Sequence, residues 1–209
     1  MKQDGIYITS AVILRNGVLV KDGAVVFEAP EKGAAFLQAV YERLGIDYPR
    51  FYKMDLLSKT GTIAADILLR GRPGSPRYLP EEQGMVLSNR NASIEADAQY
   101  LEASKAYPSP ALFVYTLPNI VIGEISIRYQ FKGENAFFVS DAFDADWIYW
   151  YVADLMQRGF LKACICGWID VLDEQPDGCL FLVEQASASA SSVFTAEMMR
   201  SIYNKDYGK

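Results

Sequence analysis

The chain has 209 residues, of which 51% are hydrophobic and 22% are charged, so it can bury a core and is too apolar for a disordered segment. Its formal net charge of −6 argues against nucleic acid as a partner, because phosphate binding needs a basic surface. It contains no histidine, which removes a Ser-His-Asp triad, a Cys-His pair and imidazole metal sites from this chain.

The chain opens with a predicted meander of short strands. Residues 6–14 are β-branched and apolar, which is typical of a strand, and Asn16-Gly17 follows as a hairpin signal. Residues 18–20 predict a second strand. After Asp22-Gly23, residues 24–27 predict a third.

Helices and a buried strand follow the meander. The apolar spacing predicts helices over 31–44 and 54–69. The stretch 71–80 holds three prolines and two glycines, which indicates a surface loop. Residues 83–88 predict a short buried strand.

The middle of the chain contains one clear helix and one ambiguous segment. Residues 93–104 predict a helix with Ile94, Ala98 and Leu101 facing inward. Residues 116–130 are rich in Ile and Val, as strands are, but Thr116 as N-cap and an early proline favour a helix. Periodicity alone leaves both open.

The last third of the chain predicts two helices and three strands. The strands are expected at 135–140, 161–169 and 178–184, the helices at 144–158 and 193–203, with a turn at Pro176-Asp177-Gly178 and an Ala/Ser linker over 186–192. Alternation of strands and helices predicts an α/β fold with a mostly parallel sheet and helices on both faces.

Three cysteines are too few for a disulfide framework. Cys164 and Cys166 stand two apart in an apolar run, so on a strand they share one face. Buried free thiols are expected here, ahead of a disulfide or a metal site.

Several segments resemble β-ketoacyl synthases of the thiolase fold. YKMDLLSK at 52–59 resembles the segment that opens the family's first core helix. Ahead of the family's nucleophile lie counterparts of SPALF at 109–113, TLPN at 116–119, GEISIR at 123–128 and FKGEN at 131–135. LMQRG at 155–159, CGWID at 166–170 and DGCLFLVE at 177–184 resemble the helix and strands that follow it.

The resemblance covers roughly residues 5–185 and implies half of a thiolase-like fold, with a mixed, mostly parallel five-stranded sheet. It also implies a helix over 116–130. It divides the chain into a ketosynthase-like amino-terminal domain, 1–185, and a linker with a terminal helix, 186–209. The second half of the family's fold is expected to be missing.

One departure from the family concerns the nucleophile. Ketosynthases carry the acyl thioester on a Cys after the nucleophile strand, within a Val-Ser-x-Ala-Cys type sequence, whereas this chain reads VSDAFD at 139–144. Phe143 takes the place of the Cys, so Ser140, Asp141, Ala142 and Phe143 form a degenerate nucleophile site. The family's catalytic histidines belong to its second half. The resemblance therefore implies a pseudoenzyme without cofactor or metal.

Other residue patterns allow competing interpretations. Asp141, Asp144 and Asp146 could bind a cation, but helix-capping carboxylates explain them without one, and Ser140 lacks a base. A basic stretch could dock an acidic acyl carrier protein, or simply form a solvated helix face. Its residues are Arg50, Lys53, Lys59, Arg70, Arg72 and Arg77.

The resemblance implies a subunit that pairs with a full-length ketosynthase, as chain length factors do, in polyketide or fatty-acid elongation of the aryl-polyene type. Phe113, Tyr115, Thr116 and Phe143 would then line or plug the shared acyl tunnel. A homodimeric acyl- or lipid-binding scaffold is the alternative, and an unrelated enzyme acting through Asp141, Asp144 or a Tyr is a third. The polar start Met-Lys-Gln-Asp-Gly is unlike a signal peptide, and no apolar run reaches the roughly 20 residues of a membrane span, so a cytoplasmic protein is expected.

Overall fold

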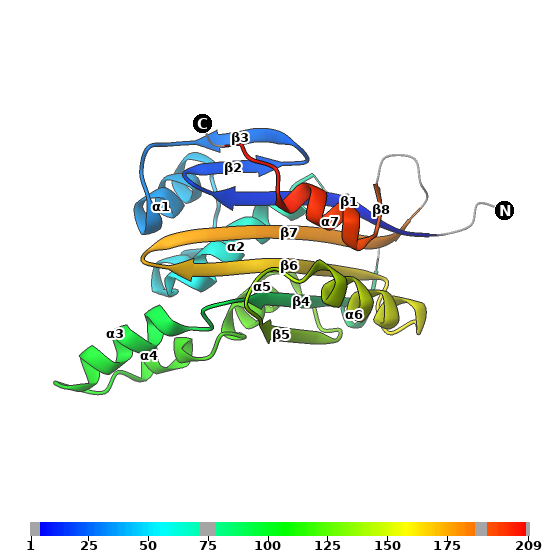
Figure 1. Ribbon diagram of the computed structural model, residues 1–209. Helices are drawn as coiled ribbons and strands as arrows, with labels where there is room; N and C mark the ends of the chain where they lie inside the picture. The colour runs from blue at the N-terminus through cyan, green and yellow to red at the C-terminus, as the bar shows by residue number, and fades with distance from the viewer. Residues whose placement is uncertain (1–4, 72–77, 187–191, 208–209) are drawn as a thin grey trace.

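A mixed sheet crosses the whole molecule, and helices cover both of its faces (Figure 1). The computed structural model describes residues 5–71, 78–186 and 192–207. Within these residues the sheet has eight strands in the order β3-β2-β1-β7-β6-β4-β5, and β8 pairs with β1. The strands are β1 (Gly5–Arg15), β2 (Val18–Lys21), β3 (Ala24–Glu28), β4 (Gln83–Asn89), β5 (Asn135–Val139), β6 (Ala163–Leu172), β7 (Gln175–Ala186) and β8 (Ser192–Val193).

The helices lie in two layers around this sheet, with one hairpin of helices outside both layers (Figure 1). They are α1 (Gly33–Arg43), α2 (Leu56–Leu69), α3 (Ile94–Ser104), α4 (Pro110–Phe113), α5 (Ile120–Tyr129), α6 (Ala145–Gln157) and α7 (Ala196–Tyr203). Three 3-10 turns join them, η1 (Pro49–Lys53), η2 (Pro80–Glu82) and η3 (Val114–Thr116).

The α/β class with helices on both faces is confirmed, but the sheet differs from the prediction of five mostly parallel strands. Five of its seven described pairings are antiparallel, and only β4 with β5 and β4 with β6 run parallel. The predicted meander β1–β2–β3 accounts for part of this, because tight turns can join only antiparallel strands. Asn16-Gly17 and Asp22-Gly23 supply those turns, with positive φ at all four residues.

The predicted turn at Pro176-Asp177-Gly178 is wrong, because these residues belong to β7. The turn between β6 and β7 lies earlier, at Asp173 and Glu174, which both adopt positive φ. Pro176 pairs with Val171 near the start of β7, a position where the missing N–H of proline is tolerated.

Two hydrophobic cores occupy the two faces of the sheet. One lies under α1, α2 and α5, and the other lies under α6 and α7. Cys164 and Cys166 share the face under α6, as predicted, and together with Cys179 they are buried free thiols. Burial raises the pKa of all three thiols well above the ordinary value, so they are poor nucleophiles.

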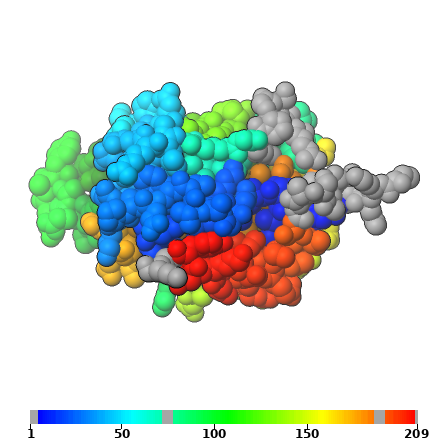
Figure 2. Space-filling model, turned by 90° about the horizontal axis from the view of Figure 1, so that it is seen from above, coloured from blue at the N-terminus to red at the C-terminus, as the bar shows by residue number. Residues whose placement is uncertain are grey.

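The hairpin formed by α3 and α4, with η3, projects beyond the body of the molecule; we call residues 94–117 the arm (Figures 1 and 2). The prediction that Ile94, Ala98 and Leu101 face inward is wrong, because all three are exposed, Leu101 by 66%. The helix itself is as predicted. Its apolar face meets solvent because α3 packs mainly against α4 and η3.

The segment 116–130 is a helix, as the resemblance implied, but it begins at Ile120 with Asn119 as N-cap, and Thr116 ends η3 instead. The terminal helix begins at Ala196 rather than at residue 193, capped by the side chain of Thr195. Most of the expected loop 71–80 and linker 186–192 lies outside the described residues. The division into 1–185 and 186–209 stays a prediction.

Within the described part of the chain, no single helix is long and apolar enough to cross a membrane. The segments 110–116 and 120–129, bent by 100° against each other, reach the required length and composition only as a pair.

Candidate functional site

The residues expected to form a degenerate nucleophile site, 140–143, lie where the parallel strands β4 and β5 end and α6 begins. Open α/β sheets bind ligands at this edge of parallel strands. The backbone N–H of Ser140 donates to the Asn89 carbonyl at 2.9 Å, which carries the pairing of β4 and β5 one residue beyond β5. Asp144 then caps α6 by accepting from the backbone N–H of Trp147 at 3.0 Å. The turn between them presents Phe143.

Phe143 is half-buried against aromatic rings of its own chain. Its ring centroid lies 6.1 Å from that of Phe181 on β7, 6.5 Å from that of Trp168 on β6, and 4.7 Å from that of Tyr203 on α7. A phenyl ring offers no lone pair to attack a thioester. Ring packing therefore fills the position that the sequence resemblance assigns to the nucleophile.

An ion pair underlies this ring cluster. Arg15 contacts Asp177 at 2.9 Å, its guanidinium carbon lies 4.5 Å from the ring centroid of Tyr203, and its Nη1 donates to the Tyr203 carbonyl at 3.0 Å. Burial, and then the nearby Asp177 carboxylate, raises the pKa of Tyr203 to about 12. Burial also raises the pKa of Asp177. The phenol therefore stays protonated at neutral pH and does not act as a base there.

A hollow of about 270 Å³ opens beside the turn. It is lined by Ser88, Phe138, Val139, Ser140, Asp144, Trp147 and Ile148. The Ser140 hydroxyl donates a hydrogen bond to the Ala142 carbonyl at 2.9 Å, and the chain has no histidine to activate it. This hollow can hold an apolar group. Its lining carboxylate, Asp144, accepts from the Trp147 N–H at the start of α6, and the chain has no histidine to serve as a general base.

The three acids near the turn are used separately. Asp144 caps α6, Asp146 pairs with Arg200 of α7 at 2.6 Å, and Asp141 is exposed. Within the described ranges, no group of three or more His, Cys, Asp or Glu side chains could hold a metal ion.

Three of the four residues expected along a tunnel lie on the arm, namely Phe113, Tyr115 and Thr116. Phe113 is 56% exposed and packs against Tyr100 with ring centroids 5.4 Å apart, and Thr116 donates to the Phe113 carbonyl at 2.8 Å. The hydroxyl of Tyr115 lies 3.2 Å from Glu124 of α5. Among the described ring contacts, none joins Phe113 to Phe143, so one chain does not bring these residues together.

The basic residues expected at a docking surface divide into two groups. Arg50, Lys53 and Lys59 lie at the start of α2, whereas Arg70 lies at its far end, roughly 20 Å away at 1.5 Å per residue. Arg70 pairs with Asp66 at 3.0 Å, and Arg50 pairs with the buried Glu124 at 3.2 Å. Lys53 is exposed and Lys59 is partly buried over the ring of Phe51. Arg72 and Arg77 lie outside the described residues.

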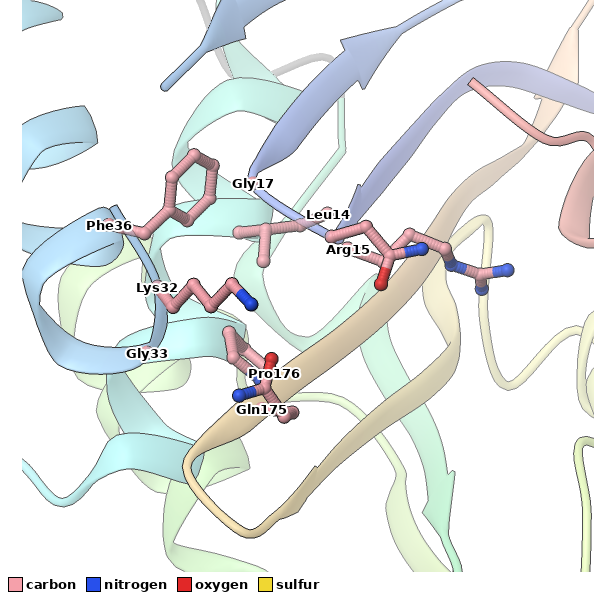
Figure 3. A pocket seen from close by; sticks show the side chains of 9 residues that line it. Leu14, Arg15, Gly17, Lys32, Gly33, Phe36, Gln175 and Pro176 are labelled. Atoms are coloured by element: carbon pink, nitrogen blue, oxygen red, sulfur yellow. The ribbon is translucent and has the colours of Figure 1, made fainter. Parts of the chain in front are cut away.

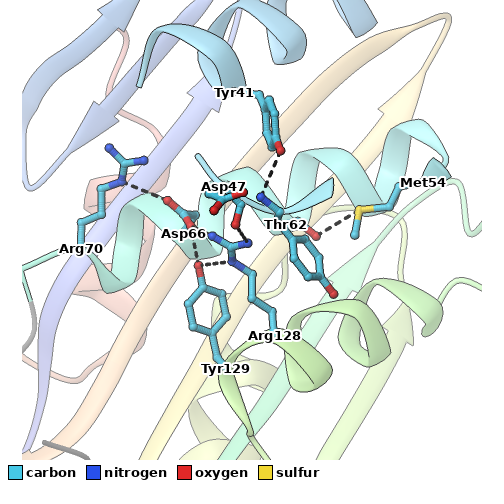
Figure 4. Close-up of polar contacts among 9 residues, drawn as sticks. Tyr41, Asp47, Met54, Thr62, Asp66, Arg70, Arg128 and Tyr129 are labelled. Atoms are coloured by element: carbon cyan, nitrogen blue, oxygen red, sulfur yellow. Dashed lines mark hydrogen bonds and ion pairs between the residues drawn. The ribbon is translucent and has the colours of Figure 1, made fainter. Parts of the chain in front are cut away.

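A buried polar network that sequence patterns did not indicate joins α2 to α5 (Figure 4). Asp66 of α2 accepts from Arg128 and from the hydroxyl of Tyr129, each at 2.6 Å. Arg128 also donates to the Asp47 carbonyl at 2.9 Å. Burial, and then Asp66, raises the pKa of Tyr129 well above its ordinary value.

A second hollow, of about 200 Å³, lies between the first hairpin and the start of α1 (Figure 3). Lys32, Phe36, Gln175 and Pro176 border it, and the Arg15 side chain points away from it. Lys32 is the N-cap residue of α1 and makes no capping hydrogen bond with its side chain. No residue predicted from the sequence as functional lines this hollow.

No model of a known protein family matches the sequence, and no curated protein matches it. Solved structures do. The ishigamide ketosynthase/chain length factor superposes with a TM-score of 0.63 and 21% identity, over 90% of this chain and 64% of that one. A type II polyketide synthase acyl-carrier protein in complex with its ketosynthase bound to the hexaketide gives 0.61 and 15%, over 88% and 63%.

A third structure is similar in size as well. The ketosynthase ApeO in complex with its chain length factor ApeC, from Xenorhabdus doucetiae, gives a TM-score of 0.58 and 13% identity, over 98% of this chain and 93% of one chain of that complex. By contrast, this chain spans less than two thirds of the length of the matched chains in the first two structures. These likenesses confirm, at the level of the fold, the resemblance to ketosynthases that the sequence motifs indicated.

Proposed function

We propose that this chain is a non-catalytic, ketosynthase-like subunit that acts with a full-length ketosynthase in acyl-chain elongation and shapes the acyl tunnel as a chain length factor does. The observation that supports it most is Phe143, which packs among Trp168, Phe181 and Tyr203 at the position of the family's nucleophile. With no histidine in the chain, a condensing residue has to come from a partner. The role belongs to the cytoplasm and to polyketide or fatty-acid synthesis of the aryl-polyene type.

In this proposal the surface of this chain that contacts the ketosynthase consists of the arm and the edge strand β5. The arm carries exposed apolar side chains, among them Leu101, Phe113 and Leu117, each more than half exposed. Strand β5 forms one edge of the described sheet, so no strand of that sheet pairs with its outer backbone groups. Val139 on this strand is 57% exposed. Apolar surface of this extent is typical of an interaction site.

The comparisons support the same assignment. Two of the similar structures combine a ketosynthase with a chain length factor, and a third includes an acyl carrier protein. In this proposal a carrier protein docks at Lys53 and Lys59, where opposite charge steers the encounter. Arg70 does not belong to that surface because it lies at the other end of α2.

An affinity purification of the tagged chain from its native host tests the proposal. We expect a complete ketosynthase at about one to one, and its loss in Leu101→Asp and Phe113→Asp variants, because a charge in an apolar interface is desolvated without a partner. Phe160→Asp is the matched control, since Phe160 is similarly exposed at 53% but follows α6, away from the arm. Recovery of the chain only with itself would contradict the proposal and favour the homodimeric scaffold.

A further inference from the structure

The terminal helix α7 covers the degenerate nucleophile site from within the same chain. Tyr203, its last residue, lies against the ring of Phe143, and α7 runs along the face of the sheet that α6 also covers (Figures 1 and 2). No residue of α7 falls in the segments that resemble ketosynthases, which end near residue 185. The helix α7 thus closes the site, although no sequence motif of the family marks it.

Two arginines, Arg15 and Arg200, hold α7 against that site, and we call their contacts the latch. Arg15 of β1 holds the end of the helix through the Tyr203 carbonyl and ring, while it pairs with Asp177. Arg200 of α7 pairs with Asp146, in the first turn of α6, at 2.6 Å. The Arg200 and Asp146 side chains are 41% and 74% exposed, so salt screens their contact and water can replace it at little cost.

The two ends of α7 are anchored unequally. Phe194 and Met199, before and within its first turns, are buried in the core under α6. Its other side borders a groove of about 420 Å³ against β1, where Met198 and Ile202 face Ile8. The start of α7 is therefore anchored in the core, whereas its Tyr203 end is held by the partly buried Ile202 and Tyr203 and by the contacts of the two arginines.

We propose that α7 is an intramolecular lid, and that Tyr203 and Phe143 together close a site for an apolar acyl chain. This inference rests on the proposed function, which supplies the acyl chain as ligand. The walls fit such a ligand, because Trp168 and Phe181 are buried rings and Tyr203 is a protonated phenol at neutral pH. In the closed arrangement the two rings occupy the volume that the chain would take, so this subunit sets how far an acyl chain can reach.

Binding of cis-parinaric acid, a fluorescent fatty acid, to the isolated full chain tests the lid. Wild type is expected to bind weakly, and the double variant Phe143→Ala/Tyr203→Ala about tenfold more tightly, because truncated rings leave an apolar cavity. Phe51→Ala removes a ring of equal size from the opposite core and is expected not to bind. Equal binding by Phe51→Ala and the double variant would show that any cavity suffices and would overturn the proposal.

The latch supplies a second readout that leaves the rings intact. Arg200→Ala and Asp146→Asn are each expected to tighten binding of the probe severalfold, and added salt is expected to do the same to wild type. Arg158→Ala is the matched control, since it breaks an exposed pair with Asp154 at the other end of α6. Unchanged binding in both latch variants and in the ring variants overturns the lid, whereas the purification from the host tests the ketosynthase partnership separately.

Discussion

Arg128 Nη2 of α5 lies 2.6 Å from Asp66 Oδ1 of α2, and both side chains are nearly buried, 15% and 9% exposed. Without Arg128 the Asp66 carboxylate keeps Arg70 and the Tyr129 hydroxyl as partners, so the loss is that of one charge-assisted hydrogen bond, about 2 kcal/mol. We therefore expect Arg128→Met to lower the free energy of unfolding by about that amount in urea denaturation. Arg158→Met, which breaks an exposed pair, is expected to cost less than about 0.5 kcal/mol. Equal losses would show that the network does not stabilise the fold.

Two helical glycines give opposite predictions for the same substitution. A Cβ at Gly61 of α2 would stand 2.2 Å from Cγ2 of the fully buried Val121, whereas no atom lies within 4 Å of one at Gly123. Alanine gains about 1 kcal/mol over glycine in a helix, but overpacking costs about 1–3 kcal/mol. Gly61→Ala should therefore destabilise the protein and Gly123→Ala should stabilise it, as thermal unfolding can show. Stabilisation by both would mean that α2 and α5 pack less closely.

The alkaline stability of the fold should depend on Tyr203. Burial and Asp177 raise the pKa of its phenol from 10.0 to about 12 in the folded protein, so above pH 10 the unfolded chain loses this proton first. The free energy of unfolding is therefore expected to fall as pH rises from about 10 to about 12. Tyr203→Phe has no proton to lose and should show a shallower fall in denaturation series across this range. An identical fall in the variant would contradict this assignment.

Restoring the thiol should not restore condensation. Phe143→Cys places a sulfur at the position of the family's nucleophile, but the chain still lacks a histidine to assist it. We expect no carbon–carbon bond formation by this variant alone, measured by mass spectrometry of carrier-bound products. Loss of the ring contacts is expected to cost about 2 kcal/mol of stability. Condensation by the variant alone would refute the inference that the missing histidine prevents catalysis, provided that alkylation confirms the new thiol.

Local chemistry made some turns predictable and concealed another. Asn16-Gly17 and Asp22-Gly23 predict tight hairpins because their residues tolerate positive φ, and both hairpins are confirmed. Asp173 and Glu174 adopt the same backbone without a glycine. Pro176-Asp177-Gly178 is the stronger local turn signal, so the turn was predicted at residues that belong to β7.

Non-local packing limited the prediction of the site. Periodicity showed that Ile94 and Leu101 share a face of α3, but it does not reveal what that face meets. The position of Phe143 followed from the resemblance of its neighbours in sequence. Its contact with Tyr203 and the Arg15 latch could not follow, because they depend on where β1 and α7 lie relative to α6.

The pairing of β1 with β7 has a consequence for synthesis of the protein. Their register runs from Gly5 opposite Ala186 to Arg15 opposite Asp177, so β1 lies beside a strand that is made much later. On the ribosome, β1 and β6 have no β7 between them until β7 itself has been translated. Such distant pairing slows folding and prolongs the exposure of unpaired strands. Slow translation at low temperature should therefore lengthen the time for which β1 lacks its partner strand β7. Chaperones that shield the unpaired strands should raise the soluble yield.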